Sequence, residues 1–402
     1  MSSAKDSPNA ERRNAIAMLT IGACFQVLFL FVAVFLAAQV FFLSDGNLVS
    51  VALFASLDML FLFLMYVPSA MLAKRIPPIW IIRVASALFC AFILVVVLQP
   101  ELLGSHYILF GAVWGAITGL FHGANNYIMS AGLKTERTQT FMAWKLALRG
   151  MIQIAFPFTF GLIIDQGSLF ITSVIVLVIC VGQFISTLFV NIPRTTSRKF
   201  QMRAYFRALR ESSFMWPAMR LWFVIFVFGM TIPMGIGITI MILVTHGDNL
   251  SLGIFGSIFA ATSIISVIIY KKSPSRVRSG FFFAAATLSI LAGAVLFWEI
   301  TTLTIVIFQA VLITLRTPVD MEEVTTRVSA AKYWGGTEFY MESLVFYETA
   351  ISAGRTVACG LLIFVAAMGA TPTMIAGLMF TITVCFAIYT IGLFRWRRRY
   401  AQ

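Results

Sequence analysis

Four ionisable side chains stand deep inside long apolar stretches of the chain. Asp58 lies in the run ALFASLDMLFLFLM, and Arg149, Glu348 and Arg355 lie in other runs that are mostly apolar. An ionisable side chain at the centre of a bilayer costs about 2.5–3.5 kcal/mol or more on insertion scales, so such residues usually serve a function. A carboxyl group there can take up and release a proton, and an arginine there needs an anion to offset its charge. We therefore predict Asp58 and Glu348 as proton-coupling residues, and Arg149 and Arg355 as substrate-binding residues.

Uncharged polar side chains recur in the same runs at helical spacing. His122 and Asn126 are four residues apart, as are Arg149 and Gln153, so each pair shares one face of a helix. Polar side chains at bilayer depth normally face a cavity or a partner helix. The predicted substrate-binding set therefore also includes Gln26, His122, Asn125, Asn126, Gln153 and Gln309. The alternative is structural: hydrogen bonds and internal salt bridges that orient the helices.

The elements that must carry these residues are long apolar segments. Of the 402 residues, 60 % are hydrophobic and only 11 % are charged, whereas about a quarter of a soluble domain is charged. This composition excludes a soluble fold. Runs that can form a membrane helix of roughly 20 residues occur at 15–43, 49–72, 79–98, 107–132, 141–164, 169–190, 217–244, 251–270, 280–298, 301–316, 341–367 and 373–394. We predict an all-α polytopic membrane protein with twelve transmembrane helices.

Two prolines, one after the tenth run and one inside the seventh, bear on helix geometry. The tenth run is the shortest, and we expect it to continue past Pro318 in a kinked form. Pro233 and Gly235 lie in the seventh run beside further glycines, a pattern that favours a bend. Such a bend is predicted to serve a gate, and the alternative is close helix packing on glycine.

Basic residues are confined to alternate connections between the runs. If the N-terminus is cytoplasmic, Lys and Arg fall in the inner connections, and the outer connections hold none. This is the positive-inside pattern, so both termini are predicted to be cytoplasmic. The expected location is a plasma membrane, specifically a bacterial inner or cell membrane, with the lipid bilayer as partner. The net charge of +13 is explained in this way, and no basic face on a polar domain indicates nucleic-acid binding.

The chain divides into two similar halves around a long basic connection. Lys74-Arg75 after the second run is matched by Lys271-Lys272 after the eighth, as expected for a duplicated six-span unit. Within the central connection, Arg203, Arg207 and Arg210 share one helical face, which is typical of a helix on anionic lipid or of a solvated linker. The predicted organisation is a tail (1–14), a six-helix bundle (15–190), a linker (191–216), a second six-helix bundle (217–394) and a basic tail (395–402).

This pattern resembles the major facilitator superfamily, because it combines twelve spans, two six-span halves and a long basic central connection. The family motif after the second span has a Gly, then Asp-Arg, then Gly-Arg-Arg, of which the segment 69–78 keeps only Arg75. The chain is therefore identified as a divergent member. The resemblance implies two pseudo-symmetric bundles, with spans 2 and 11, and spans 5 and 8, facing each other across a central cavity. It implies that span 4 lines this cavity and that spans 3, 6, 9 and 12 face lipid. It also implies an Asp58–Arg355 pair between the bundles and gate or loop roles for Lys74 and Arg75.

The sequence carries no motif of an enzyme or an ATPase. It lacks HExxH, GxSxG, the Walker A pattern and GxGxxG, so we do not expect an enzyme. No cofactor and no metal site are expected, because the three histidines are scattered and the five cysteines lie in apolar runs without CxxC spacing.

The resulting prediction is a secondary active transporter. It is expected to move a small organic solute by alternating access, coupled to protons or to another ion, and to function as a monomer. Basic residues outnumber acidic ones on the candidate cavity helices, which favours an anionic or zwitterionic solute. A drug or hydrophobic-compound efflux antiporter is the alternative. An intramembrane enzyme and a non-transporting, receptor-like membrane protein are further alternatives.

Overall fold

The computed structural model describes residues 8–131, 135–166, 168–190, 199–245, 248–335 and 338–400, nearly all of them helical. The first half of the chain forms α1 (Pro8–Leu30), a π-helical segment (Phe31–Leu36), α2 (Ala37–Leu43), α3 (Leu48–Ala73), α4 (Pro78–Leu98), α5 (Leu102–Ser105), α6 (Tyr107–Ala131), α7 (Thr135–Gln166) and α8 (Leu169–Leu188). The linker contains α9 (Met202–Glu211). The second half forms α10 (Met215–Thr231), α11 (Met234–Thr245), α12 (Asn249–Lys272), α13 (Ser275–Val295), α14 (Thr302–Gly335), α15 (Tyr340–Ala367) and α16 (Pro372–Tyr400).

The predicted all-α polytopic architecture with twelve spans is confirmed. Eleven helices in the described ranges are long and apolar enough to cross a membrane, the first being α1 continued through the π-helical segment and α2. The remaining span consists of α10 and α11, and the helix is interrupted between Thr231 and Met234. Helix α14 continues through Pro318 as expected. Helix also covers parts of both predicted tails, because α1 begins at Pro8 and α16 ends at Tyr400; residues 1–7 and 401–402 lie outside the described ranges.

Residues in the connections between the spans stabilise the starts of the helices that follow. At one end of the bundle, Asn47 accepts a hydrogen bond from the N–H of Val49 (2.9 Å) and Asp248 accepts one from the N–H of Ser251. These side chains cap α3 and α12 by satisfying N–H groups that have no partner within the helix. At the other end, α4 starts at Pro78 and α13 starts directly after Pro274. Proline suits the first turn of a helix because its missing N–H is not needed there.

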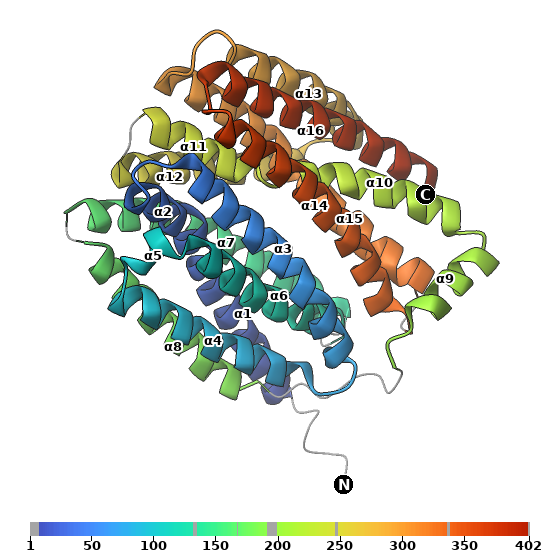
Figure 1. The fold of residues 1–402 in the computed structure, drawn as a ribbon. Coiled ribbons are helices and arrows are strands. Elements are labelled where there is room, and N and C mark those ends of the chain that lie inside the picture. The colour runs from blue at the N-terminus through green and yellow to red at the C-terminus, as the bar shows by residue number, and fades with distance from the viewer. Residues whose placement is uncertain are drawn as a thin grey trace.

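The two halves repeat the same packing, as the predicted duplication requires. In the first half α4 packs against α6 and α8, and α1 packs against α8; in the second half α13 packs against α14 and α16, and α10 packs against α16. In Figure 1 the blue-to-green half and the yellow-to-red half lie side by side. Because twelve spans alternate in direction, the N-terminal end of α1, the linker and the C-terminal end of α16 share one end of the bundle. We call this predicted cytoplasmic end the inner end, and the opposite end the outer end.

Two helix pairs form the most extensive packing between the halves, and both agree with the expected pairing of spans 2 with 11 and 5 with 8. Helix α3 packs against α15, and α7 packs against α12. In the second pair, Ser257 of α12 accepts a hydrogen bond from the N–H of Phe158 (3.1 Å) and donates one to the carbonyl of Ile154 (2.6 Å), both in α7. A side chain of one half thus bridges the backbone of the other beside Pro157.

The seam between α3 and α6 is the closest helix–helix contact within the first half. Gly111, Gly115, Gly119 and Gly123 lie four residues apart on α6, and a Cβ atom on any of them would collide with α3. For Gly115 the collision would be with the carbonyl of Asp58. Small residues at this spacing allow helix backbones to approach closely in membranes, so this stripe fixes the position of the backbone that carries Asp58.

The first spans of the two halves are both irregular at similar positions. The π-helical segment occupies Phe31–Leu36, and span 7 is interrupted at Ile232 and Pro233, about 200 residues later. Interrupted helices at corresponding positions of two repeats are a feature of transporter folds. The break lies where Pro233 was predicted to bend the helix, and Gly235 follows it in the first turn of α11.

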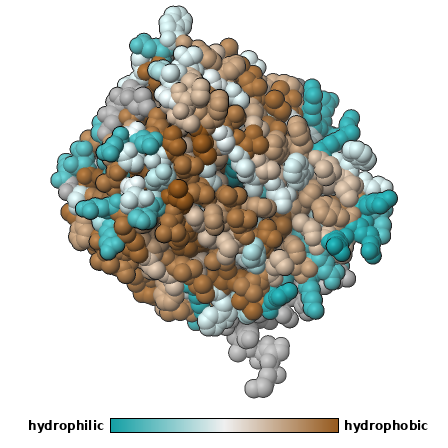
Figure 2. All heavy atoms as spheres, viewed as in Figure 1, coloured by the Kyte–Doolittle hydropathy of each residue, from teal (hydrophilic) through white to brown (hydrophobic). Residues whose placement is uncertain are grey.

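The surface shows an apolar band between two polar margins. In Figure 2 brown residues cover the middle of the visible face, and teal residues gather at two opposite edges. Large exposed hydrophobic side chains are numerous on α4, α8 and α13, including Trp80, Val178 and Leu291. This agrees with the expectation that spans 3, 6 and 9 face lipid, whereas α16, span 12, exposes only Ile388 among its large hydrophobic side chains in the described structure.

Candidate functional site

At the inner end, a buried ion pair joins the two halves. Lys74 follows the last residue of α3, and its Nζ lies 2.7 Å from both carboxylate oxygens of Glu342 in the first turn of α15. The Lys74 side chain is 2 % exposed and that of Glu342 is 0 % exposed. The same Nζ donates to the carbonyl of Glu338 (3.1 Å). Lys74, predicted as a gate or loop residue, is therefore in direct contact with the other half, whereas Arg75 beside it is exposed.

The linker docks onto this ion pair. The N–H of Gln201 donates to Oε1 of Glu342 (2.8 Å), and Tyr205 in α9 donates its hydroxyl to Oγ of Ser343 (3.1 Å). Burial raises the pKa of Tyr205 to about 12, an effect that the bond to Ser343 opposes and the charge of Glu342 reinforces. Tyr205 therefore stays neutral at physiological pH. Residues 191–198 of the linker lie outside the described ranges.

Near mid-depth, the expected Asp58–Arg355 ion pair is absent from the described structure. Nη1 of Arg355 instead lies 3.2 Å from Oε1 of Glu348, seven residues earlier on the same helix. Two turns of one helix place these side chains on one stripe, so the pair forms without help from the other half. Arg355 is nevertheless the basic residue whose charge acts on Asp58, and Oδ1 of Asp58 is buried without a hydrogen-bond partner.

The polar residues of span 4 have different surroundings. Nδ2 of Asn126 donates to the hydroxyl of Tyr66 in α3 (3.2 Å). The ring of His122 packs edge-on against Phe25 of α1, with ring centroids 5.0 Å apart. Asn125 is half-buried. Span 4 thus contacts spans 1 and 2 through this face.

The predicted glutamines are distributed over three spans. Gln26 on α1 and Gln153 on α7 are half-buried. Gln309 on α14 is 6 % exposed, and its Oε1 is buried without a partner. No hydrogen bond brings the three together in the described structure, so they stay predictions as substrate contacts.

Arg149 and Lys145 form a basic patch on α7. They lie one turn apart, and neither forms a hydrogen bond or an ion pair within the described ranges. Their charges both act on His122, together with that of Arg355. The acidic residue whose charge acts on Arg149 is Asp320 of α14, in the other half.

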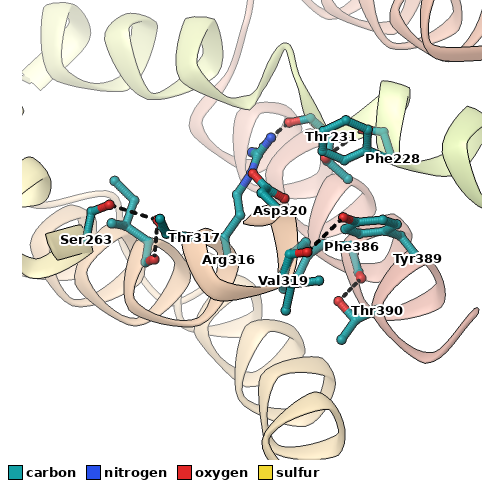
Figure 3. A network of polar contacts seen from close by, with 11 residues as sticks. Phe228, Thr231, Ser263, Arg316, Thr317, Val319, Asp320, Phe386, Tyr389 and Thr390 are labelled. Atoms are coloured by element: carbon teal, nitrogen blue, oxygen red, sulfur yellow. Dashed lines mark hydrogen bonds and ion pairs between the residues drawn. The ribbon is translucent and has the colours of Figure 1, made fainter. Parts of the chain in front are cut away.

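Span 10 contributes the most charged side chains of any span. Nε of Arg316 lies 3.0 Å from Oδ2 of Asp320, and Nε of Arg327 lies 3.0 Å from Oε1 of Glu323. Figure 3 shows Arg316 between Asp320 and the carbonyl of Thr231. Nη1 of Arg316 donates to that carbonyl at 3.0 Å.

Asp320, Glu323 and Arg327 are absent from the predicted site. The tenth apolar run ends at residue 316, and the predicted continuation past Pro318 had no defined end, so the site prediction included no residue of this span beyond Gln309. The helix nevertheless runs on to Gly335. The available signal was the spacing: Arg316 and Asp320, and Glu323 and Arg327, are oppositely charged pairs four residues apart, which is a helical arrangement.

Comparisons with known proteins identify the fold. No protein-family model and no curated protein sequence matches the chain. A bacterial homologue of the iron transporter ferroportin in an inward-facing state is similar with a TM-score of 0.65 at 14 % identity, over 97 % of this chain and 99 % of that one. The outward-facing structure of a bacterial ferroportin homologue has a TM-score of 0.60 at 15 % identity, over 97 % and 100 % of the two chains.

A third solved structure agrees with these two. A bacterial homologue of the human lysosomal transporter Spinster, inward-facing and unoccupied, has a TM-score of 0.59 at 13 % identity, over 98 % of both chains. At such low identities the likeness shows the fold alone. This chain has the fold of the major facilitator superfamily, as the resemblance predicted, and its sequence is highly divergent.

Proposed function

We propose that this protein is a secondary active transporter that moves a small anionic or zwitterionic organic solute by alternating access. The fold supports this function because it places two six-helix bundles around a shared interface, the arrangement in which bundles rock about a central site. Contacts between the halves occur at the inner end through Lys74–Glu342 and along α7 and α12. Alternating access would require these contacts to break and form in turn.

The observation that carries the choice of solute is the basic patch of Lys145 and Arg149. In the described structure Arg83 on span 3 donates to the backbone carbonyls of Thr187 and Val190, and Arg316, Arg327 and Arg355 on spans 10 and 11 each have a carboxylate within 3.2 Å. Lys145 and Arg149 have none. Arg149 lies within the candidate membrane span Ala147–Gln166, where an unpaired cation is costly, so an anionic group of the solute is the natural partner. Arginine suits this role because its planar fork binds a carboxylate or phosphate through two hydrogen bonds.

We further infer proton coupling at Asp58, with Glu348 as the second candidate. Oδ1 of Asp58 is buried and unpaired, and Asp58 lies on α3, which contacts α15 of the other half. Glu348 is neutralised by Arg355 in this state, so its protonation would have to accompany a rearrangement of that pair. The proposed setting is a cell membrane with both termini cytoplasmic.

The test is uptake into proteoliposomes containing the purified protein. A panel of labelled carboxylates, phosphate esters and amino acids would be offered with and without an inward proton gradient, with empty liposomes as control. We expect at least one anionic or zwitterionic compound to accumulate, and to do so less when the gradient is removed. Transport of lipophilic cations but of none of these compounds would instead support the efflux alternative and contradict the proposed solute class.

A further inference from the structure

The break in span 7 leaves helix carbonyls that need partners. Pro233 has no N–H, and the N–H of Ile232 donates to the carbonyl of Gly229 (3.2 Å) three residues back, which tightens the last turn of α10. Beyond the break, the N–H groups of Ile236 and Gly237 both reach the carbonyl of Pro233, at 3.0 and 3.1 Å. The carbonyl of Thr231, the last residue of α10, points to a side chain of another helix.

That side chain is Arg316 of α14. Its Nη1 donates to the Thr231 carbonyl, and its Nε donates to Oδ2 of Asp320, each over 3.0 Å (Figure 3). A cation at the C-terminus of a helix is favoured by the partial negative charge there. In an uninterrupted helix the Thr231 carbonyl would accept from the N–H of Gly235, four residues on. Arg316 therefore occupies an acceptor that a continuous span 7 would use itself.

The position of the break matters because α11 lies over the contact between the halves. Helix α11 packs against the π-helical segment and α3 of the first half, and Ile240 of α11 is only 4 % exposed. A small apolar pocket at this outer end is lined by Leu48 of α3, Ile240 of α11 and Leu362 of α15, among others. Straightening span 7 would move α11 relative to these neighbours.

Asp320 connects this arrangement to the basic patch. Its Oδ2 holds Arg316, its Oδ1 is buried without a partner, and its charge also acts on Arg149 of the first half. Asp320 therefore contacts Arg316 through one oxygen, and its other oxygen has no partner in the described structure.

We propose that Arg316, held by Asp320, is a positioning residue that keeps span 7 broken after Thr231 and α11 closed over the outer end. When either side chain is lost, the Thr231 carbonyl is free to accept the helical hydrogen bond from the N–H of Gly235. Span 7 then straightens, and the outer end opens. The inference rests on the proposed function in treating the movement of α11 as that of a gate. The contacts themselves, and the test below, do not depend on any solute.

The experiment measures access to one engineered thiol. Ile240→Cys is introduced after Cys24, Cys90, Cys180, Cys359 and Cys385 have been replaced by Ser or Ala, and the rate of modification by a membrane-impermeant maleimide is followed in liposomes. We expect Arg316→Gln and Asp320→Asn to accelerate modification roughly tenfold or more, since a hydrogen bond to a charged group contributes on this scale. Arg316→Lys keeps the charge but has a single donor nitrogen in place of the Nε and Nη1 that contact Asp320 and Thr231. It is expected to give an intermediate rate.

The matched control is the second oppositely charged pair on the same helix. Glu323→Gln and Arg327→Gln remove a pair with the same 3.0 Å geometry that makes no contact with Thr231, and modification is expected to stay within about twofold of the parent rate. The proposal is overturned if Arg316→Gln and Asp320→Asn react at the parent rate, or if the control variants accelerate modification equally. If the thiol responds as expected but no anion is taken up by the parent protein, the proposed solute class fails and the role of Arg316 stands.

Discussion

At the scale of single residues, the important contrast is between paired and unpaired charges. Arg355 and Arg316 are held by carboxylates of their own helices, Glu348 and Asp320. Arg149 has no such neighbour on α7 and forms no ion pair with another helix in the described structure. An ion pair within one helix forms at little cost in free energy and already neutralises its arginine. The unpaired Arg149 is therefore the residue that can bind an anionic group of the solute.

Arg149→Lys tests this directly. Lysine keeps the charge but replaces a planar fork with a point charge, so we expect KM for the transported anion to rise roughly tenfold, with a smaller effect on the maximal rate. Uptake kinetics of the proteoliposome assay give both values. Arg207→Lys on the exposed face of α9 is the control and should leave KM unchanged. A normal KM in Arg149→Lys would remove Arg149 from the binding site.

Asp58→Asn separates coupling from binding. Asparagine keeps the shape and hydrogen-bonding capacity of the side chain but cannot ionise. We expect accumulation driven by a proton gradient to be lost, and exchange of internal for external solute to continue. The measurement is uptake with and without the gradient, beside counterflow in the same vesicles. Unchanged gradient-driven accumulation would assign Asp58 a purely structural role.

At the scale of helices, the glycine stripe of α6 determines how closely spans 2 and 4 approach. Gly115→Ala places a methyl group against the backbone carbonyl of Asp58, which cannot move as a flexible side chain can. Overpacking of this kind destabilises by about 1–3 kcal/mol, so we expect a clearly lower melting temperature in detergent. Gly182→Ala on α8, where a Cβ meets no atom within 4 Å, should melt at or above the parent temperature. Equal melting of the two variants would show that the seam tolerates separation.

The helices themselves were largely predictable, and the pairings between their side chains were not. Apolar runs give the spans because a bilayer requires about 20 apolar residues for each. A continuation of the tenth span past Pro318 was predicted, but the length of α14 was not, because hydropathy falls at Asp320 and Glu323 whereas the helix runs on to Gly335. The partner of Arg355 was misassigned because a family resemblance pointed across the halves, whereas Glu348 on the same stripe was nearer. The role of Glu342 depends on a contact with Lys74, 268 residues away in the chain, and no local pattern specifies such a contact.

At the scale of the whole molecule, transport requires the halves to separate at each end in turn. The buried Lys74–Glu342 pair and the linker bound to it hold the inner end together. Removing one partner alone would leave a buried charge uncompensated, which is strongly destabilising. A reversible covalent link between the same two positions tests the movement without that complication, because both charges are replaced together.

We therefore predict that a cross-link between Lys74→Cys and Glu342→Cys stops transport. In the cysteine-free chain, a short bifunctional thiol reagent that contains a reducible disulfide would join the two halves at the inner end. We expect uptake to fall to the level of empty liposomes and to recover when the reagent is cleaved, because rocking of one bundle against the other is then restored. The matched control joins Ser86→Cys to Gln183→Cys, two buried positions whose side chains are 3.3 Å apart within the first half. That link leaves both bundles free to move as units, so uptake should persist. Full uptake with the inner end verifiably cross-linked would contradict alternating access by these two halves.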